Sequence, residues 1–569
     1  MLQNNQTALQ EKLIRFNQQA EERDAERRAA RQGKPYLNMV TTPIEIEALA
    51  LIPEERAKKL NLAAINLVNK DLIVAVFDLG AAGVKEELER FQKLGYNNQI
   101  FVASMSGLRH AWSYYRYVKS KAEDIIGEVR LNAEKLKALK KEATTIGKLK
   151  GWLEEFNFNK VPVTEFLEAV FGGALALSAS DIHFEPAKVN VELRMRLDGV
   201  LHPVLGGEGG GRLPKDFYRQ VVSRIKLLAG LRLNITNETQ DGRFTIAMGK
   251  ENVEVRVAVA PAEYGEVIVM RLLDPETISL EVAQLGFRMS DQKTAEAELK
   301  KPNGMMLVTG PTGSGKTTTL YAFLKRVATS EVKIITIEDP VEYHLEGIEQ
   351  TQVDAEAGYT FASGLKSILR QDPDVILVGE IRDQETAGIA VNASLTGHLV
   401  FSTLHTNDAA GAIPRLVDLK AEASLISAAL DLVIAQRLVR KLCEKCRESQ
   451  PVTATLRARW EKFVAKLPES VKKNDKVKIP SVIYESPRQK KECERCGGTG
   501  YKGRVAIFEL FQVTDEVERM IAEKHAVLDI REMAKKQGMV TMQEDGLLKV
   551  MGGVTSLEEV ERVTGEIEF

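Results

Sequence analysis

The chain has 569 residues, of which 44% are hydrophobic and 28% are charged, with a formal net charge of −2. This length predicts about three to five domains of ordinary globular composition. A near-zero net charge offers no overall basic field for nucleic acid, and no apolar run approaches the roughly 18 residues of a membrane span. The N-terminus lacks a signal-peptide pattern, and four cysteines in two C-x-x-C pairs fit a reducing compartment. We therefore expect a cytoplasmic protein.

Residues 1–35 are predicted to form a charged N-terminal helix. Leu9, Leu13 and Phe16 fall on one helical face, and almost every later position is polar until Gly33-Lys34-Pro35 ends the pattern. Two interpretations stay open. The helix is either a solvated, frayed segment or a docking helix for a partner.

Residues 36–118 are predicted to form a small N-terminal α/β domain. The apolar run 72–77 is typical of a strand, and the charged pattern 85–93 after Gly80 and Gly83 indicates a turn and a helix. Residues 119–150 are rich in Lys, Glu and Ala and favour a helical linker.

Residues 151–280 are predicted to form a second N-terminal domain of α+β type. The stretches 191–197 and 253–259 alternate polar and apolar residues, as half-buried strands do. The Gly-rich stretch 206–211 between them predicts a mobile loop.

From residue 281 onward, buried strands alternate with helices, which predicts a mainly parallel α/β core. Residues 310–317 fit G-x-x-x-x-G-K-[ST] in full, between a strand at 305–309 and a helix from 318. A chance Gly-rich turn is the alternative, and the flanking strand and helix disfavour it. Backbone N–H groups would hold phosphate, Lys316 would reach the β- and γ-phosphates, and Thr317 would bind Mg²⁺. The predicted nucleotide ligands are Gly310, Pro311, Thr312, Gly313, Ser314, Gly315, Lys316, Thr317 and Thr318.

Two acids follow apolar strands and are candidate catalytic residues. Glu338 follows the strand at 333–337, and Glu380 follows the strand at 374–378. The carboxyl ends of parallel strands share one edge of a sheet, so both acids are expected near the phosphate loop. One would orient or deprotonate water, and the other would hold the metal's hydration shell. Ordinary surface carboxylates are the alternative. Gly379 stands where many such enzymes carry a metal-binding Asp.

Two histidines bracket a further strand-like run at 399–404. His405 is a candidate γ-phosphate sensor and His398 a candidate nucleotide ligand. Either side chain could instead satisfy a backbone carbonyl, and the spacing does not decide between these roles.

The four cysteines form a C-x₂-C…C-x₂-C set that predicts a structural zinc site. The gap of 46 residues between the pairs exceeds the usual spacing, but Gly497 and Gly498 suit a knuckle turn. Lys445 and Arg495 would offset the charge of the thiolates. Four reduced, unligated thiols are the alternative. The predicted ligands are Cys443, Cys446, Cys493 and Cys496.

The chain resembles the cytoplasmic ATPases that assemble type IV pili or drive type II secretion. GPTGSGKTTTLYAFL, TIEDPVEY, ILRQDPDVILVGEIRD and TGHLVFSTLHTNDAAGAIPRL resemble the family's Walker A, Asp box, Walker B and His box, in that order. SDIHFEP, QDGR and CERCGGTGYKGR resemble its second N-terminal domain and its cysteine motif. The resemblance is close from about residue 160 to 569, weak over 36–118 and absent before 36.

The resemblance implies a RecA-like ATPase domain over 281–569, with a zinc module at 440–503 and a C-terminal helical region at 513–569. The domain at 151–280 would be PAS-like. The resemblance also implies a homo-hexamer that binds ATP, Mg²⁺ and Zn²⁺ and pushes on an inner-membrane platform protein at the cytoplasmic face of the membrane. Glu338 would be the general base, Glu380 would position Mg²⁺ and water, and both histidines would line the site. Arginines of the second domain would reach the γ-phosphate, with Arg243, Arg256 and Arg271 as candidates.

The cysteine motif favours the assembly and secretion branches over the pilus-retraction branch. Residues 451–486 would be an insertion attached at the metal module, with a solvated Lys-rich run. Pilus assembly, type II secretion and DNA uptake all stay open. A nucleotide-binding regulator without turnover and a nucleic-acid translocase are further alternatives. The two acids argue against the regulator, and the net charge argues against the translocase, so we expect no nucleic-acid partner.

Overall fold

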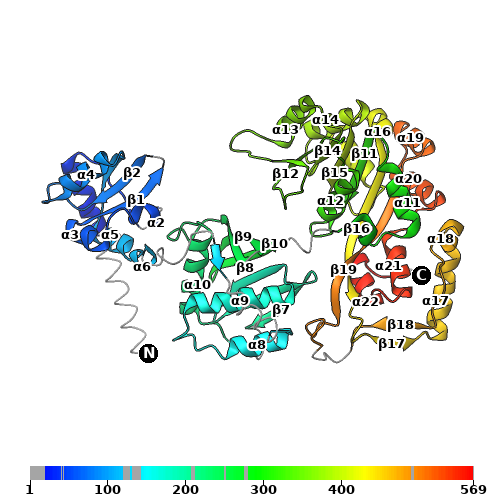
Figure 1. Cartoon of the computed structure of the whole chain (residues 1–569), viewed down its shortest axis with the longest axis horizontal. Coiled ribbons are helices and arrows are strands. Elements are labelled where there is room, and N and C mark those ends of the chain that lie inside the picture. The colour runs from blue at the N-terminus through cyan, green and yellow to red at the C-terminus, as the bar shows by residue number, and fades with distance from the viewer. Residues whose placement is uncertain are drawn as a thin grey trace. The chain divides into compact units, whose positions relative to one another are not determined.

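The computed structural model describes residues 20–39, 41–42, 44–68, 70–118, 128–130, 143–206, 212–248, 251–273, 280–487, 493–567 and 569. The chain divides into two compact units (Figure 1). The first holds residues 1–143, 148–197 and 201–272, and the second holds residues 144–147, 198–200 and 273–569. Within the described residues, no helix has the length and apolar character that crossing a bilayer requires.

The first unit begins with a three-stranded sheet in the order β1-β2-β3. β1 runs antiparallel to β2, and β2 runs parallel to β3. Its elements are α2 (Ile46–Leu49), α3 (Glu54–Leu60), β1 (Leu62–Val68), β2 (Asp71–Val76), α4 (Val84–Lys93), β3 (Asn97–Val102), α5 (Met105–Trp112) and α6 (Tyr115–Val118). The strand predicted at 72–77 and the helix predicted at 85–93 are present as β2 and α4.

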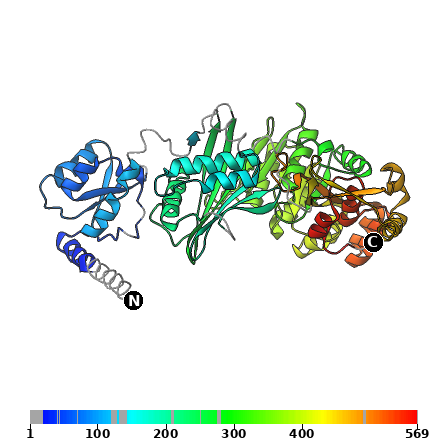
Figure 2. The same cartoon turned by 90° about the horizontal axis from the view of Figure 1, so that it is seen from below.

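The helix over residues 20–32 contacts the segments that follow β2 and β3 (Figure 2). Ala25 and Ala29 are buried. The Arg28 guanidinium lies 3.6 Å from the centre of the Phe77 ring and donates to the Phe77 carbonyl at 2.6 Å. Residues 20–32 are therefore packed along one face, while the opposite face is exposed, as the solvated interpretation expects. The apolar face predicted around Leu9, Leu13 and Phe16 lies outside the described residues.

The second sheet of the first unit has the order β4-β8-β9-β10-β5-β6-β7. Its strands are β4 (Glu128–Arg130), β5 (Asp181–Pro186), β6 (Val191–Leu197), β7 (Val200–Leu205), β8 (Gln240–Met248), β9 (Glu251–Ala262) and β10 (Gly265–Leu273). The accompanying helices are α8 (Ile146–Glu154), α9 (Val163–Leu177) and α10 (Lys215–Leu228). Burial alternates along β6 as the sequence pattern predicts.

Residues 128–130 contradict the prediction of a helical linker over 119–150. They form β4, which pairs in parallel with β8. Three paired residues gain ladder hydrogen bonds that a free helix could not make, so tertiary pairing overrides the local helix propensity. The remainder of the predicted linker lies outside the described residues, except for residues 143–145 and the start of α8. Most of the predicted mobile loop, residues 207–211, also lies outside them.

The second unit is built on a seven-stranded sheet in the order β13-β12-β14-β15-β11-β16-β19. All neighbours pair in parallel except β16 and β19. The strands are β11 (Gly304–Thr309), β12 (Ile334–Glu338), β13 (Glu349–Gln352), β14 (Val375–Val378), β15 (Leu399–Leu404), β16 (Leu430–Leu442) and β19 (Tyr501–Gln512). The mainly parallel α/β core predicted from the sequence is confirmed.

Helices cover both faces of this sheet. They are η3 (Val282–Gln284), α11 (Met289–Glu298), α12 (Lys316–Val327), α13 (Phe361–Ile368), η4 (Leu369–Gln371), α14 (Gln384–Leu395), α15 (Ala412–Asp418) and α16 (Ala423–Ala429). Every residue of β11 is buried, and its side chains alternate between two cores. Met305 and Leu307 belong to one hydrophobic cluster, whereas Met306 and Val308 belong to the other. A strand buried on both faces explains the continuous apolar run in the sequence.

The C-terminal part is a long β16–β19 ribbon with an insertion and four helices. The insertion contains β17 (Glu448–Pro451), α17 (Ala454–Lys466), α18 (Glu469–Asn474) and β18 (Val482–Glu485). The chain continues with α19 (Asp515–Ala522), α20 (Val527–Lys536), α21 (Met542–Met551) and α22 (Leu557–Thr564). These four helices agree with the helical character predicted for 513–569.

The insertion packs on the C-terminal helices, which the sequence interpretation did not foresee. Trp460, Phe463, Leu467 and Val471 share one buried cluster with residues of α21 and α22. Hydrophobic burial therefore holds the insertion along its length, and it is not attached only at the cysteines. Val471, which begins the run described as solvated, is buried.

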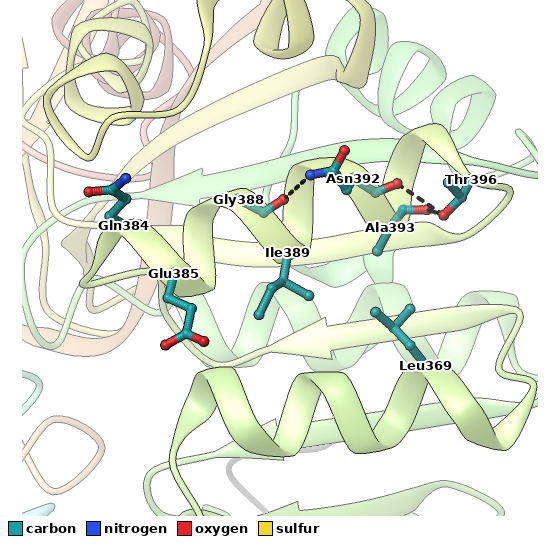
Figure 3. Close-up of a pocket in the computed structure, with 8 residues that line it drawn as sticks. All are labelled: Leu369, Gln384, Glu385, Gly388, Ile389, Asn392, Ala393 and Thr396. Atoms are coloured by element: carbon teal, nitrogen blue, oxygen red, sulfur yellow. Dashed lines mark hydrogen bonds between the residues drawn. The ribbon is translucent and has the colours of Figure 1, made fainter.

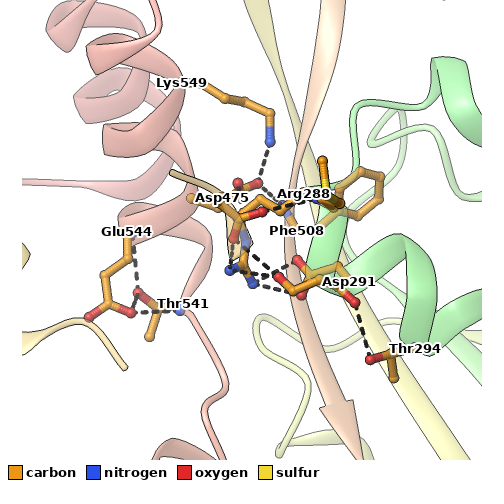
Figure 4. A network of polar contacts seen from close by, with 11 residues as sticks. Arg288, Asp291, Thr294, Asp475, Phe508, Thr541, Glu544 and Lys549 are labelled. Carbon is orange, nitrogen blue, oxygen red and sulfur yellow. Dashed lines mark hydrogen bonds and ion pairs between the residues drawn. The ribbon is translucent and has the colours of Figure 1, made fainter. Parts of the chain in front are cut away.

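A buried charge network fixes the end of α18 to the start of α11 (Figure 4). The Arg288 guanidinium lies 2.7 Å from Asp291, 3.5 Å from Asp475 and 3.7 Å from Asp545. The Lys549 ammonium lies 2.5 Å from Asp545. Three carboxylates face two cations, so the network carries one excess negative charge when all five groups are ionised. Burial raises the pKa of Asp291 to about 6, with Arg288 opposing the rise.

Candidate functional site

The strands that lead to the predicted phosphate loop and acids, β12, β14, β15 and β11, are neighbours in the large sheet (Figure 1). Thr309 pairs with Leu404, and Ile337 pairs with Val378. Because these strands run parallel, the residues that follow them emerge at the same edge. This register brings Gly310, the start of the loop, to the same edge as Glu338, Glu380 and His405.

The loop at 310–317 has a conformation that requires its glycines. At Gly310 φ is 144°, and an added Cβ would lie 2.5 Å from the Gln436 carbonyl oxygen. Gly315 caps α12 with φ 90°. Pro311, Thr312 and Gly313 are exposed, Ser314 is buried, and Thr317 and Thr318 are half-buried in the first turn of α12. The first N–H groups of a helix have no intrahelical acceptors and favour an anion.

Lys316 lies over the loop. Its Nζ donates to the Gly310 carbonyl at 2.9 Å and to the Pro311 carbonyl at 3.2 Å. Burial lowers the pKa of Lys316, and the charge of Glu380 opposes this effect. The Glu380 charge therefore acts on the loop cation, in agreement with the strand register that brings both residues to this edge.

Gln436 is hydrogen-bonded to the phosphate loop and to α12, and it was not predicted from the sequence. Its Nε2 donates to the Ser314 carbonyl at 2.8 Å, and its Oε1 accepts from the Thr319 hydroxyl at 2.8 Å. The residue is 1% exposed. Its place directly after the apolar run 432–435 is a signal that could have identified it, because a buried amide needs partners.

Glu380 forms a cluster with a histidine and an arginine. Its Oε2 lies 3.5 Å from His405 Nε2, and its Oε1 forms an ion pair with Arg382. The second guanidinium nitrogen of Arg382 lies 3.8 Å from Asp339. Arg382 was not predicted, although its place two residues after Glu380 at a strand end is a usable signal. The Glu380 side chain is 13% exposed, so the acid keeps an opening to bound groups.

Glu338 is almost fully buried and accepts hydrogen bonds from three side chains. Oε2 accepts from the Tyr321 hydroxyl, while Oε1 accepts from Thr336 Oγ1 at 2.6 Å and from Gln350 Nε2 at 3.2 Å. Burial and then the charge of Glu338 raise the pKa of Tyr321, which keeps the phenol a donor. None of these three partners was predicted from the sequence. Tyr321 lies on α12 and Gln350 on β13, whereas Thr336 shares β12 with Glu338.

His398 stands apart from this edge, and its prediction as a nucleotide ligand is wrong within this chain. It precedes β15, whereas His405 follows that strand. Seven residues at about 3.3 Å each put the two histidines on the order of 20 Å apart. His398 Nδ1 lies 3.0 Å from the Ala393 carbonyl at the end of α14. It therefore takes the structural role that the sequence left open.

The three predicted arginines lie on strands of the first unit. Arg243 is directly opposite Arg256 on β8 and β9, and 81% of the Arg243 side chain is exposed. Arg271 lies 3.1 Å from Asp181, whose other oxygen lies 3.2 Å from Arg196. Arg271 and Arg196 are the direct cross-strand neighbours of Asp181. Arg196 thus shares Asp181 with Arg271, and the sequence prediction did not include Arg196.

The four cysteines converge at the far end of the β16–β19 ribbon. Their sulfur atoms all lie within 4.8 Å of one another. The Cys443–Cys493 and Cys446–Cys496 sulfur distances are 3.9 and 3.7 Å. Four sulfurs at Zn–S bonds of about 2.3 Å form a tetrahedron with edges of about 3.8 Å, so the cluster fits zinc. Arg495 pairs with Glu444 at 2.8 Å, so its charge is directed to that acid rather than to the thiolates alone.

A shallow groove of about 590 Å³ runs along α14 (Figure 3). It is lined by Leu369, Gln384, Glu385, Gly388, Ile389, Asn392, Ala393 and Thr396. None of the predicted site residues lines it. The only charged side chain in this lining, Glu385, forms an ion pair with Lys366.

Comparisons with known proteins agree with this geometry. The family model described as "Type II/IV secretion system protein" matches residues 157–562. The type IV pilus assembly ATPase PilB of Thermus thermophilus is 38% identical over 97% of this chain, which covers 58% of that protein's length. PilB of Myxococcus xanthus is 36% identical over 93% of this chain and 88% of its own length.

Type II secretion proteins match a shorter part of the chain. The type II secretion system ATPase E of Vibrio cholerae is 44% identical over 71% of this chain and 76% of its own length. The X-ray structure of the Yersinia pseudotuberculosis ATPase DotB has a TM-score of 0.50 at 18% identity, and the match covers 72% of this chain and 95% of DotB. That likeness supports the fold.

Proposed function

The chain belongs to the type II/IV secretion system protein family, and we propose that it is an ATP-hydrolysing motor that assembles a type IV pilus or pseudopilus. The observation that carries this proposal is the meeting of the phosphate loop, Glu380 and His405 at one sheet edge, with Glu380 and His405 3.5 Å apart. Glu338 follows β12 to the same edge. A loop that only binds nucleotide would not need these acids.

The proposed chemistry divides binding from cleavage. Backbone N–H groups of the loop and the Lys316 ammonium bind the phosphates of ATP. Thr317 would hold Mg²⁺, which supplies charge neutralisation at the phosphate oxygens when bound. Glu380 and Glu338 orient water and accept its proton, with Glu338 as the proposed base. His405 stabilises charge that develops on the γ-phosphate.

The proposal also gives a role to arginines of the first unit. Arg243, Arg256 and Arg271 lie on neighbouring strands of one sheet, from which they could present positive charge to the γ-phosphate. Charge supplied in this way accelerates other NTPases by on the order of 10³–10⁵. Binding and release of nucleotide would then move one unit against the other within a homo-hexamer.

Pilus assembly is favoured over type II secretion by the extent of the matches. The two pilus assembly relatives align with 97% and 93% of this chain, whereas the Vibrio type II protein aligns with 71%. The longer alignments must include most of the region before residue 157. That N-terminal region is where we propose that assembly partners dock. The type II secretion and DNA-uptake motors remain the second candidates.

The remaining assignments follow from the same proposal. We assign 1–35, 36–118, 151–280 and 281–569 as successive parts of the chain, with residues 128–130 added to the sheet of the third, and zinc held by the four cysteines as a structural ion. The partner would be an inner-membrane platform protein, reached from the cytoplasmic face. Nucleic acid is not among the proposed partners.

Phosphate release by the purified chain tests this function. We expect steady ATP hydrolysis that DNA does not stimulate and that Lys316→Ala abolishes through loss of nucleotide binding. Binding without turnover would favour a regulator, and turnover that depends on DNA would favour a translocase. Co-purification of membrane proteins with residues 1–150 would then separate pilus assembly from type II secretion.

A further inference from the structure

Glu338, the buried acid at the end of β12, is hydrogen-bonded to α12, the helix that begins at the phosphate loop. Tyr321 lies five residues after Lys316 on α12 and donates its hydroxyl to Glu338 Oε2. Tyr321 is 1% exposed. Its ring packs edge-on against Tyr343, with centroids 4.5 Å apart. The phenol therefore has little freedom to choose another acceptor.

Gln350 closes this contact into a network. Its Nε2 lies 3.2 Å from Glu338 Oε1 and 3.3 Å from the Tyr321 hydroxyl oxygen, and it also donates to the Tyr343 carbonyl at 3.1 Å. Thr336 supplies the third side-chain donor to the acid. The network thus joins α12, β12 and β13 around one carboxylate.

The three side-chain donors leave the Glu338 carboxylate one lone-pair position that can accept a further hydrogen bond. A carboxylate has about four lone-pair positions, two on each oxygen. Thr336 and Gln350 occupy both positions on Oε1, and Tyr321 occupies one on Oε2. The free position on Oε2 is the one beside the phenol. The direction of the Tyr321 bond therefore decides where Glu338 can accept a proton from water.

We propose that Tyr321 is a positioning residue for ATP hydrolysis, which fixes the open lone pair of Glu338 relative to the phosphate loop through α12. The inference rests on the proposed function, because it assigns a role within that reaction. Tyr321 touches neither nucleotide nor water in this role. It acts through Glu338, because its hydrogen bond connects this acid to α12, the helix that begins at the loop.

The charged surroundings of Glu338 allow a pH readout. Tyr321 faces it from α12, and Tyr343 and Glu342 belong to the segment after β12. Gly379 packs on its Cα from β14, followed by Glu380, and the donors from β12 and β13 are uncharged. In the described part of the chain Glu338 forms no ion pair. Removing one hydrogen-bond donor from a carboxylate disfavours its ionised form, which is the form that accepts a proton. As pH falls, that form would therefore be lost at a higher pH in the variant than in the wild type.

Tyr321→Phe in the full-length hexamer tests the proposal, with Tyr359→Phe as the matched control. Tyr359 likewise donates its hydroxyl to a side chain of this sheet, but its acceptor is Thr351 on β13, at 3.2 Å. We expect Tyr321→Phe to lower kcat about 10- to 100-fold, as misplacement of a reacting group does. The KM for ATP should stay within about twofold, since the loop is intact. The acidic limb of the kcat–pH profile should move to higher pH, and Tyr359→Phe should change neither quantity.

Each outcome decides a different point. A Tyr321→Phe enzyme with the wild-type kcat and pH profile overturns the positioning role alone. A wild-type protein that binds ATP without turnover overturns the proposed function and this inference with it. If Tyr321→Phe fails to fold, as judged by its thermal unfolding midpoint, Gln350→Met removes the second donor of the same network. That variant must then reproduce the lower kcat and the shifted limb, and an unchanged profile would overturn the proposal.

Discussion

His405 Nε2 lies 3.5 Å from Glu380 Oε2, across the ends of two neighbouring parallel strands. Glu380 belongs to the segment that resembles a Walker B, and His405 belongs to the segment that resembles a His box. The two residues are 25 positions apart along the chain. The register of β14 and β15 explains the contact, since Val378 pairs with Ser402 and both strands end at the same edge of the sheet. His398, from the same histidine pair, is excluded from this contact by the length of β15.

The two histidines should respond differently to the same substitution. His405→Asn shortens the side chain and removes Nε2 from Glu380, so we expect kcat to fall on the order of 10²-fold, as when one charge-stabilising donor is removed. His398→Asn keeps a nitrogen donor near the position of Nδ1 and should retain wild-type turnover. Steady-state phosphate release measures both.

Equal losses in the two variants would contradict this division of roles. ATP affinity, measured with a fluorescent analogue, should stay unchanged in both, because neither histidine contacts the loop residues that bind phosphate. A large loss of affinity in His398→Asn would restore the original prediction for that residue.

Asp291 should give the second unit an unusual pH dependence. Burial raises its folded pKa to about 6, above the value near 4 expected in an unfolded chain. The folded state then holds this proton more tightly, so this group's contribution to stability is present below about pH 4 and falls as pH rises to about 6. The total loss should be on the order of 2–3 kcal/mol.

Asp291→Asn removes this dependence and leaves two carboxylates facing two cations. We expect the variant and the wild type to have the same free energy of unfolding near pH 4 and the variant to have the larger one at pH 7. Denaturant unfolding measures this difference. Asp216→Asn is the control, because its side chain is 87% exposed, and it should leave the stability–pH curve unchanged. A variant less stable than the wild type at pH 7 would show that the Arg288–Asp291 attraction outweighs burial.

The cysteine cluster predicts a simple thiol count. The chain has four cysteines, so a metal-loaded protein should show almost no reactive thiol, and a chelator should release four per chain. Elemental analysis should find one zinc per chain, and Cys496→Ser should lower both the zinc content and the thermal midpoint. Four reactive thiols in freshly purified, metal-replete protein would mean that the site is not a zinc site.

The sequence predicted the strands and the residues that end them, because a buried parallel strand is a continuous apolar run followed by a functional residue. Glu338, Glu380 and Gly310 were all found in this way. The partners that hold them were missed because they come from other elements. Tyr321 and Gln350 carry no signal in spacing, and only folding brings them to the site.

Long-range packing accounts for the wrong predictions. Residues 128–130 have helical composition, yet they add a strand to β8. The insertion at 451–486 is polar on average, yet Trp460 and Val471 bury one face of it. His398 and His405 are symmetric in the sequence, and only the direction of β15 separates them.

The most direct test of the account compares ATP binding with ATP cleavage in Glu380→Gln, with Glu385→Gln as the control. Glu385 is a nearby exposed acid paired with Lys366. We predict that Glu380→Gln binds ATP with an affinity within about threefold of the wild type and loses turnover by at least about 10²-fold, while Glu385→Gln behaves as the wild type. Wild-type turnover by Glu380→Gln would contradict the proposal that this edge of the sheet cleaves ATP.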